Sequence, residues 1–128
     1  MVIWQADFYH HRQQQAAGQV LWELLICDRD RTFEFEARCP QSEANSHWVA
    51  VQLQLAADGN LPDVIQVFRP QSLGLIEQAG RSLGINVQPT RRTFALKQWL
   101  QEKQYPTVVD KPPPAPLPEN LWGKEWRF

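Results

Sequence analysis

The sequence is poor in the residues that build disulfide scaffolds and simple metal sites. Among 128 residues there are two cysteines and three histidines. Cys27 ends an apolar run and Cys39 precedes a proline, so neither has the spacing of a disulfide framework or a zinc site. His10 and His11 are adjacent, and His47 has no histidine one helical turn away. These residues therefore predict neither a metal site nor a cofactor.

Long apolar runs and an excess of one charge are also missing. No stretch approaches the roughly 20 apolar residues of a membrane-spanning helix, and the chain opens on a strand-like pattern without a signal or transit peptide. The formal net charge is -1 and the pI is about 6.3, so any nucleic-acid contact must come from a local basic patch. We expect a cytoplasmic protein without membrane insertion.

What the sequence does contain is typical of one globular domain. It is 43% hydrophobic and 21% charged, with six tryptophans and six phenylalanines, which is too aromatic for a disordered segment. The composition changes after Tyr105, because 111–118 is rich in proline and 121–128 is strongly aromatic. We expect an α/β domain over 1–105. Residues 106–128 should form a Pro-rich strap and a Trp-rich tail leading to a C-terminal domain that this chain does not include.

Hydrophobic periodicity predicts five strands and three helices in the order βββαβαβα. The expected strands are 2–10, 20–27, 33–38, 64–68 and 85–87, and the expected helices are 42–57, 72–83 and a third beginning near Thr93. The charged turn at 28–31 makes the second and third strands a hairpin. A hairpin followed by two βαβ crossovers gives an α+β mixed sheet of ribonuclease H-like topology, with helices packed on five strands.

The first helix is expected to bury one apolar stripe, with Ser42 as its N-cap. The stripe consists of Ala44, Trp48, Val51 and Leu55, broadened by Val49 and Leu53. The segment Asp58-Gly59-Asn60 should end this helix, and Gly84 should end the second one.

Two polar loops, 69–72 and 90–93, follow the fourth and fifth strands and lead into helices. They should meet at the edge of the sheet where α/β domains bind ligands. Helix N-terminal amides, hydroxyls and guanidinium groups suit phosphate oxygens. Plain helix capping also explains the Pro-Gln-Ser segment, and a solvated pair explains the two adjacent arginines. The candidate contact residues are Arg69, Gln71, Ser72, Arg91, Arg92, Thr93 and Lys97.

A ribonuclease H-like nuclease would need carboxylates that hold Mg²⁺ at the end of the first and fourth strands. Asp7 lies in the first strand and Glu43 early in the first helix, but the fourth strand ends in Phe68-Arg69, with a cation where a ligand is needed. The simpler interpretation is that Asp7 is a surface or salt-bridged strand residue.

Many segments, in one order along essentially all 128 residues, resemble the N-terminal domain of the Tab2/Atab2 family. So many matching segments are far more specific than any single motif. The segments are Ile3-Trp4-Gln5-Ala6-Asp7-Phe8-Tyr9, Leu21-Trp22-Glu23-Leu24, Cys39-Pro40-Gln41-Ser42-Glu43-Ala44-Asn45, Val67-Phe68-Arg69-Pro70-Gln71-Ser72, Pro89-Thr90-Arg91-Arg92-Thr93 and Leu117-Pro118-Glu119-Asn120-Leu121-Trp122-Gly123.

The resemblance implies a non-catalytic RNA-binding protein that supports translation of photosystem reaction-centre messages, photosystem I above all. The implied partners are RNA, with an A/U-rich or untranslated-region segment as a candidate, the protein's own C-terminal domain, and translation or assembly factors. The absence of a transit peptide suits a cyanobacterial, cytoplasmic member, whereas plant and algal relatives belong in the chloroplast stroma. No family catalytic residue can be carried over.

Two alternatives remain open from the sequence. The first is a protein-interaction module in photosystem assembly that uses the Pro-rich strap and the tail with Trp122 and Trp126. The second is a Mg²⁺-dependent nuclease, active or degenerate, that uses Asp7 and Glu43.

Overall fold

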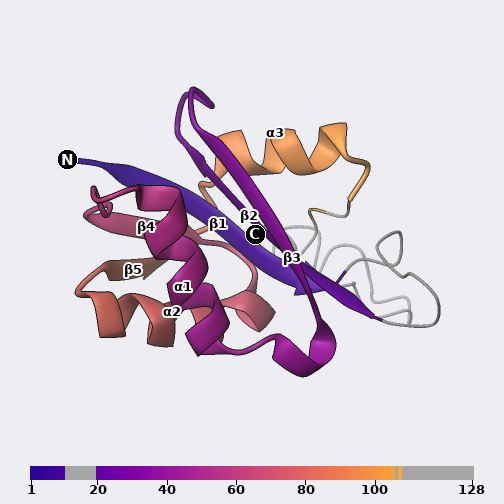
Figure 1. Cartoon of the computed structure of the whole chain (residues 1–128). Helices are drawn as coiled ribbons and strands as arrows, with labels where there is room; N and C mark the ends of the chain where they lie inside the picture. Colours follow the sequence, from indigo (N-terminus) through magenta and orange to yellow (C-terminus); the bar gives the residue numbers. More distant parts are fainter. Residues whose placement is uncertain (11–19, 106, 108–128) are drawn as a thin grey trace, which may run out of the picture.

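The computed structural model describes residues 1–10, 20–105 and 107 (Figure 1). Apart from residue 107, the strap and tail expected over 106–128 lie outside the described residues. The βββαβαβα order is confirmed, with one short 3₁₀ turn added after the third strand. The elements are β1 (Ile3–His10), β2 (Leu21–Asp28), β3 (Glu34–Pro40), η2 (Gln41–Glu43), α1 (Ser46–Ala57), β4 (Val64–Val67), α2 (Pro70–Leu83), β5 (Asn86–Pro89) and α3 (Phe94–Glu102).

The five strands form one mixed sheet in the order β3-β2-β1-β4-β5. β2 pairs antiparallel with both β1 and β3, which confirms the predicted hairpin. β4 runs parallel to both β1 and β5. β1 is therefore central, and the arrangement has the ribonuclease H-like topology that the sequence predicts.

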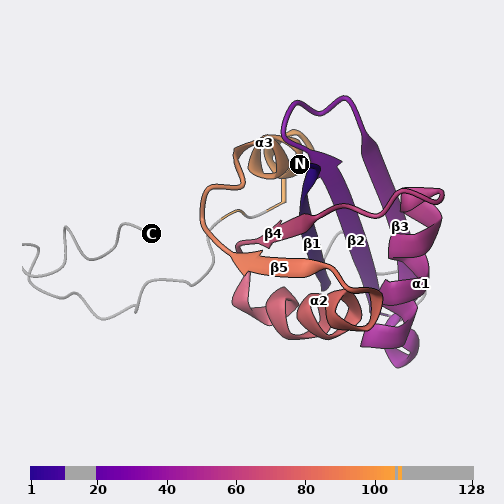
Figure 2. The same ribbon diagram turned by 90° about the vertical axis from the view of Figure 1, so that its left-hand side faces the viewer.

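Helices cover both faces of the sheet, as the two views of the ribbon show (Figures 1 and 2). α1 and α2 pack together on one face, while α3 lies on the other, against β2 and β1. β1 is consequently buried on both sides. Trp4, Ala6 and Phe8 face α1 and α2, and the alternate residues Gln5 and Asp7 face the α3 side.

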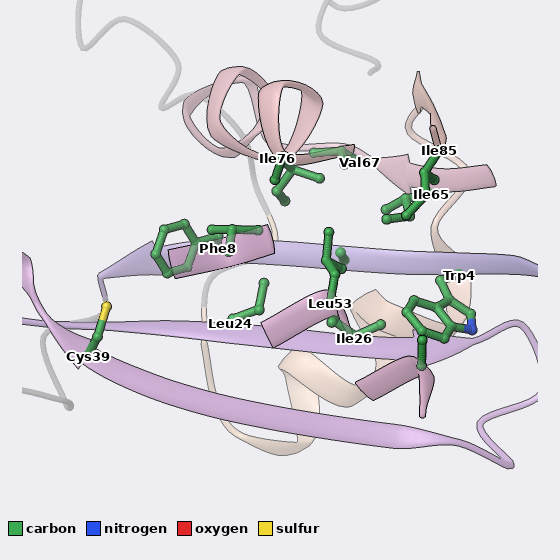
Figure 3. Close-up of a cluster of buried hydrophobic side chains, with 14 residues drawn as sticks. Trp4, Phe8, Leu24, Ile26, Cys39, Leu53, Ile65, Val67, Ile76 and Ile85 are labelled. Atoms are coloured by element: carbon green, nitrogen blue, oxygen red, sulfur yellow. The ribbon is translucent and has the colours of Figure 1, made fainter. Parts of the chain in front are cut away.

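The core beneath α1 and α2 is aliphatic and aromatic (Figure 3). Phe8 stacks on Trp48 with ring centroids 5.4 Å apart. Gly80 lets α2 approach β5 closely, because a Cβ atom there would lie only 2.6 Å from Val87 Cγ2. Any larger residue would have to push α2 and β5 apart.

The start of α1 differs from the prediction, and its buried face agrees with it only in part, at Val49, Leu53 and Trp48. Asn45, rather than Ser42, is the N-cap, and its Oδ1 accepts a hydrogen bond from Trp48 N at 2.8 Å. Ser42 lies in η2. The buried stripe is Val49, Leu53 and Ala57; Val51 and Leu55 are 37% and 64% exposed. The helix is apolar on nearly every side, so its periodicity alone does not decide which stripe faces the sheet.

The ends of the helices follow the predicted turn chemistry more closely. Asp58 adopts the left-handed conformation with φ 49° and Gly59 follows with φ 92°, which ends α1 where the sequence predicts. Gly84, at φ 76°, caps α2 as expected. β5 runs one to two residues later than predicted and includes Pro89, which an edge strand tolerates.

Candidate nucleic-acid interface

The two predicted segments, 69–72 and 90–93, lie side by side at one edge of the sheet. Residues 70–72 are not a loop, however, because α2 begins at Pro70, two residues earlier than predicted. β4 and β5 are parallel and in register, with Val67 opposite Pro89, so the segments that leave them start at the same level. Together they line a hollow of about 390 Å³. Its lining residues are Val67, Phe68, Arg69, Pro70, Leu73, Pro89, Thr90, Arg91 and Arg92.

Arg69 lies in the floor of this hollow and is committed to a buried ion pair. Its Nε donates to Asp7 Oδ1 at 2.8 Å and its Nη2 donates to Asp7 Oδ2 at 3.3 Å. The two side chains are 3% and 1% exposed. The guanidinium also lies 4.4 Å from the centroid of the Tyr9 ring and 5.0 Å from that of Phe68. Asp7 is therefore the salt-bridged strand residue of the simpler interpretation.

Ser72 joins α2 to β1 and does not cap the helix. Phe8 N donates to Ser72 Oγ at 3.1 Å, and Ser72 Oγ lies 2.7 Å from Phe8 O and 3.1 Å from Asp7 Oδ1. Its side chain is fully buried. The ion pair and this hydroxyl together fix the start of α2 against the central strand.

Thr93 precedes α3 at the N-cap position, but its side chain makes no capping hydrogen bond. Its hydroxyl is buried and has no hydrogen-bond partner in the part of the chain that the structure describes. The cap comes from β1 instead, because Gln5 Oε1 accepts a hydrogen bond from Leu96 N at 2.9 Å. Arg69, Ser72 and Thr93 thus support the surface from beneath.

The other predicted contact residues face outward to a greater degree. Gln71, Arg91 and Arg92 are exposed, and Lys97 is partly buried. Lys97 Nζ donates to Arg91 O at 2.7 Å and lies 4.9 Å from the centroid of the Phe68 ring. Burial, with a smaller contribution from the positive charge of Arg91, lowers the pKa of Lys97. Lys97 therefore holds the 90–93 loop in place beside the two arginines.

A second hollow of about 590 Å³ adjoins the first and shares Thr90 and Arg92 with it. Gln5, Gln66 and Gln88 stand in register on β1, β4 and β5 and line its floor. The remaining lining residues are Arg29, Phe94 and Ala95. The sequence patterns above do not predict this hollow. The available signal was a glutamine inside each of these three strands.

The two candidate metal ligands do not form a metal site with the residues around them. Asp7 is paired with Arg69, so a cation at Asp7 would have to displace a guanidinium. Glu43 is exposed in η2 and lines a different hollow, with His47 and Trp48. In the described ranges, no group of three or more His, Cys, Asp or Glu side chains is placed to hold a metal ion.

Cys27 and Cys39 are both buried free thiols. Burial raises the pKa of Cys27 to about 12 and that of Cys39 to about 11, so both are inert at neutral pH. Among the described helices, none combines the length and the apolar character needed to cross a bilayer.

Comparison of the fold with solved structures returns integrase catalytic core domains. The catalytic core domain of HTLV-2 integrase, solved in complex with magnesium, superposes with a TM-score of 0.50 at 14% sequence identity. The match covers 82% of this chain and 76% of the integrase chain. At this identity the likeness concerns the fold alone.

Comparison of the sequence gives closer relatives. The protein called TAB2 homolog, chloroplastic, is 30% identical in Zea mays and 31% identical in Arabidopsis thaliana, and each match covers 98% of this chain. The chain spans only 37% and 38% of the lengths of these relatives. A family model described as RNA-binding protein Tab2/Atab2 N terminal matches residues 3–103, which include every described strand and helix. Because this match extends over most of the chain, the protein belongs to the Tab2/Atab2 N-terminal family.

Proposed function

We propose that this protein binds RNA, with backbone phosphates held by Arg91 and Arg92 at the mouth of the two adjoining hollows. The observation that carries the proposal is the position of these two exposed arginines. Both line the first hollow, and Arg92 also lines the second. A strand lying across this edge can therefore contact both arginines while its bases enter a hollow.

The local charge supports the proposal even though the whole chain is nearly neutral. None of the described residues that line the two hollows is acidic. Asp7 compensates the charge of Arg69, but Arg29, Arg91, Arg92 and Lys97 add positive charge around the same edge. Such a patch is the local basic surface that phosphate binding requires.

The family match supports the same ligand, because the matching model is described as an RNA-binding protein. The biological role that we propose is the one implied by the resemblance: support for translation of photosystem reaction-centre messages, mainly those of photosystem I. Gln71, exposed in the first turn of α2, would orient the strand, and Arg69, Ser72 and Thr93 would hold the surface in shape.

Salt-dependent binding tests the RNA proposal. The affinity of the chain for a fluorescein-labelled single-stranded RNA should fall with salt, with a slope of about 0.7 for each phosphate contact. Replacing Arg91→Glu and Arg92→Glu together should reduce that slope by about 1.4 and weaken binding at low salt. Arg92→Glu alone should reduce the slope by about 0.7. Arg81→Glu, which reverses an exposed arginine near the end of α2, is the matched control for that single reversal.

If the double reversal leaves both the affinity and its salt slope at the wild-type values, the RNA proposal is contradicted, because this edge then does not contact RNA.

The translation role has a separate test. In cells whose own copy carries the double reversal, synthesis of photosystem I reaction-centre proteins should fall while their messages persist. If synthesis of these proteins is unchanged, RNA binding at this edge does not support their translation.

A further inference from the structure

The second hollow contains a row of three carboxamides that crosses the sheet at right angles to the strands. Gln5 Nε2 donates to Gln66 Oε1 at 3.4 Å, and Gln66 Nε2 donates to Gln88 Oε1 at 3.1 Å. The row runs from the buried side chain of Gln5 to the exposed side chain of Gln88 at the edge of the sheet.

The direction of this row is fixed at its inner end. Leu96 N–H is a donor, so the atom of Gln5 that faces it must be the oxygen. Gln5 must then present its nitrogen to Gln66, and Gln66 its nitrogen to Gln88. The row therefore ends in Gln88 Nε2, a group with two N–H donors, at the exposed side of the hollow. Each hydrogen bond polarises the next, which strengthens the terminal donor.

The wall of the same hollow carries an aromatic ring and two cations. Phe94, the first residue of α3, is 71% exposed. An exposed phenylalanine is unremarkable by itself. Here, however, Phe94 shares one hollow with the amide row, Arg29 and Arg92. A nucleotide can use all three groups. Its base stacks on a flat π surface, the edge of the base accepts from an N–H donor, and its phosphate binds a guanidinium.

We infer that the second hollow binds one unpaired nucleobase of the RNA strand. The base stacks on Phe94, its edge accepts hydrogen bonds from Gln88 Nε2, and its phosphate lies against Arg92. The volume of about 590 Å³ is within the usual range of small-molecule sites, large enough for one nucleotide. The inference rests on the proposed function, since it names the contact that this site makes with a base.

The direction of the amide row sets what the base edge must offer. Because the row ends in a donor, Gln88 Nε2 pairs with an acceptor on the base, either a carbonyl oxygen of uracil, cytosine or guanine or a ring nitrogen of adenine. The edge contact should therefore depend on Gln88, whereas stacking should not.

The test compares labelled oligouridine with an abasic ribose-phosphate strand of equal length, using the whole chain and fluorescence anisotropy. Stacking on an aromatic ring typically contributes about five- to hundredfold in affinity. The wild-type protein should prefer oligouridine to the abasic strand by a factor in this range. Phe94→Ala should remove most of that preference and leave affinity for the abasic strand unchanged. Leu55→Ala, an exposed apolar residue on α1, is the matched control and should leave the preference intact.

A second variant checks the edge contact. Gln88→Ala should weaken binding of oligouridine and leave the affinity for the abasic strand unchanged. If Phe94→Ala and Gln88→Ala both retain the wild-type preferences, while reversal of Arg91 and Arg92 still reduces the salt slope and weakens binding, the base site is wrong and the proposed function stands. If the wild-type chain shows no salt-dependent affinity for oligouridine or for the abasic strand, both the base site and the proposed function are wrong.

Discussion

The face of the sheet beneath α1 and α2 is filled by aliphatic and aromatic side chains. The α3 side has a smaller apolar cluster and also buries Gln5, Asp7 and Glu23, for which we call it the polar face. β1 supplies residues to both faces, because its successive residues point to opposite sides of the sheet, and Glu23 comes from β2. The apolar face depends on area and volume, so many apolar residues could fill it. The polar face depends on specific partners, since a buried polar group without one is destabilising.

The candidate site develops from the polar face. Asp7 places Arg69 in the floor of the first hollow, and Gln5 both caps α3 and begins the amide row of the second. The buried polar groups therefore position the loops that carry the exposed arginines. This difference between the faces predicts that paired replacement can rescue stability on the polar face but that truncation on the apolar face cannot be compensated so simply.

Breaking the buried ion pair between Asp7 and Arg69 should give the largest loss of stability. Asp7→Leu leaves the Arg69 guanidinium buried without its carboxylate, and we expect the free energy of unfolding to fall by about 3–5 kcal/mol in urea denaturation. The double variant Asp7→Leu with Arg69→Met removes both charges and should recover most of that loss. A double variant as unstable as Asp7→Leu would mean that charge compensation is not what the pair provides.

Truncation on the apolar face comes next. Leu53 is fully buried, and Leu53→Ala should lower the free energy of unfolding by about 2–5 kcal/mol. Leu55 lies on the same helix but is 64% exposed, so Leu55→Ala should change the free energy of unfolding by no more than about 0.5 kcal/mol. Equal losses for the two variants would mean that α1 is rotated relative to the orientation described above.

This pair of leucines also marks the limit of what the sequence can predict. The strand order and the topology follow from alternation, turn residues and the handedness of crossovers, all of which are local or general. The orientation of α1 does not follow from the sequence, because the helix has apolar residues on two stripes. Only the fit against β1 and α2 selects the stripe with Val49 and Leu53. Asn45 is preferred to Ser42 as the cap because η2 delays the helix.

The location of the candidate site was predictable for a similar reason. Parallel β4 and β5 bring the two loops together whatever their side chains do. The roles of individual residues were less accessible. Ser72 and Thr93 have the composition of caps, yet tertiary contacts bury one against Phe8 and leave Gln5 to cap α3. The amide row depends on the register of three strands, which no single segment encodes.

The smallest expected effect concerns Glu23, which is buried with two cations beside it. Arg38 Nη2 lies 2.9 Å and Lys103 Nζ 3.9 Å from Glu23 Oε2. Burial raises the pKa of Glu23, and the Tyr105 hydroxyl and these two cations offset only part of that rise. The folded state thus holds the proton more tightly than the unfolded state does. The stabilising contribution of protonated Glu23 is complete below the ordinary pKa of 4.5 and declines as the pH rises through the raised pKa.

Glu23→Gln should remove that decline, because glutamine stays neutral. The difference in the free energy of unfolding between this variant and the wild type should grow in favour of the variant as the pH rises from 4.5, and then level off. Urea denaturation across this range measures it. Glu36→Gln, which removes an exposed carboxylate from the same two cations, controls for lost surface attraction and should cost less than about 1 kcal/mol. If Glu23→Gln loses stability steadily as the pH rises, the attraction of Arg38 and Lys103 outweighs burial. The polar face would then be held by charge more than by the matching of neutral donors and acceptors.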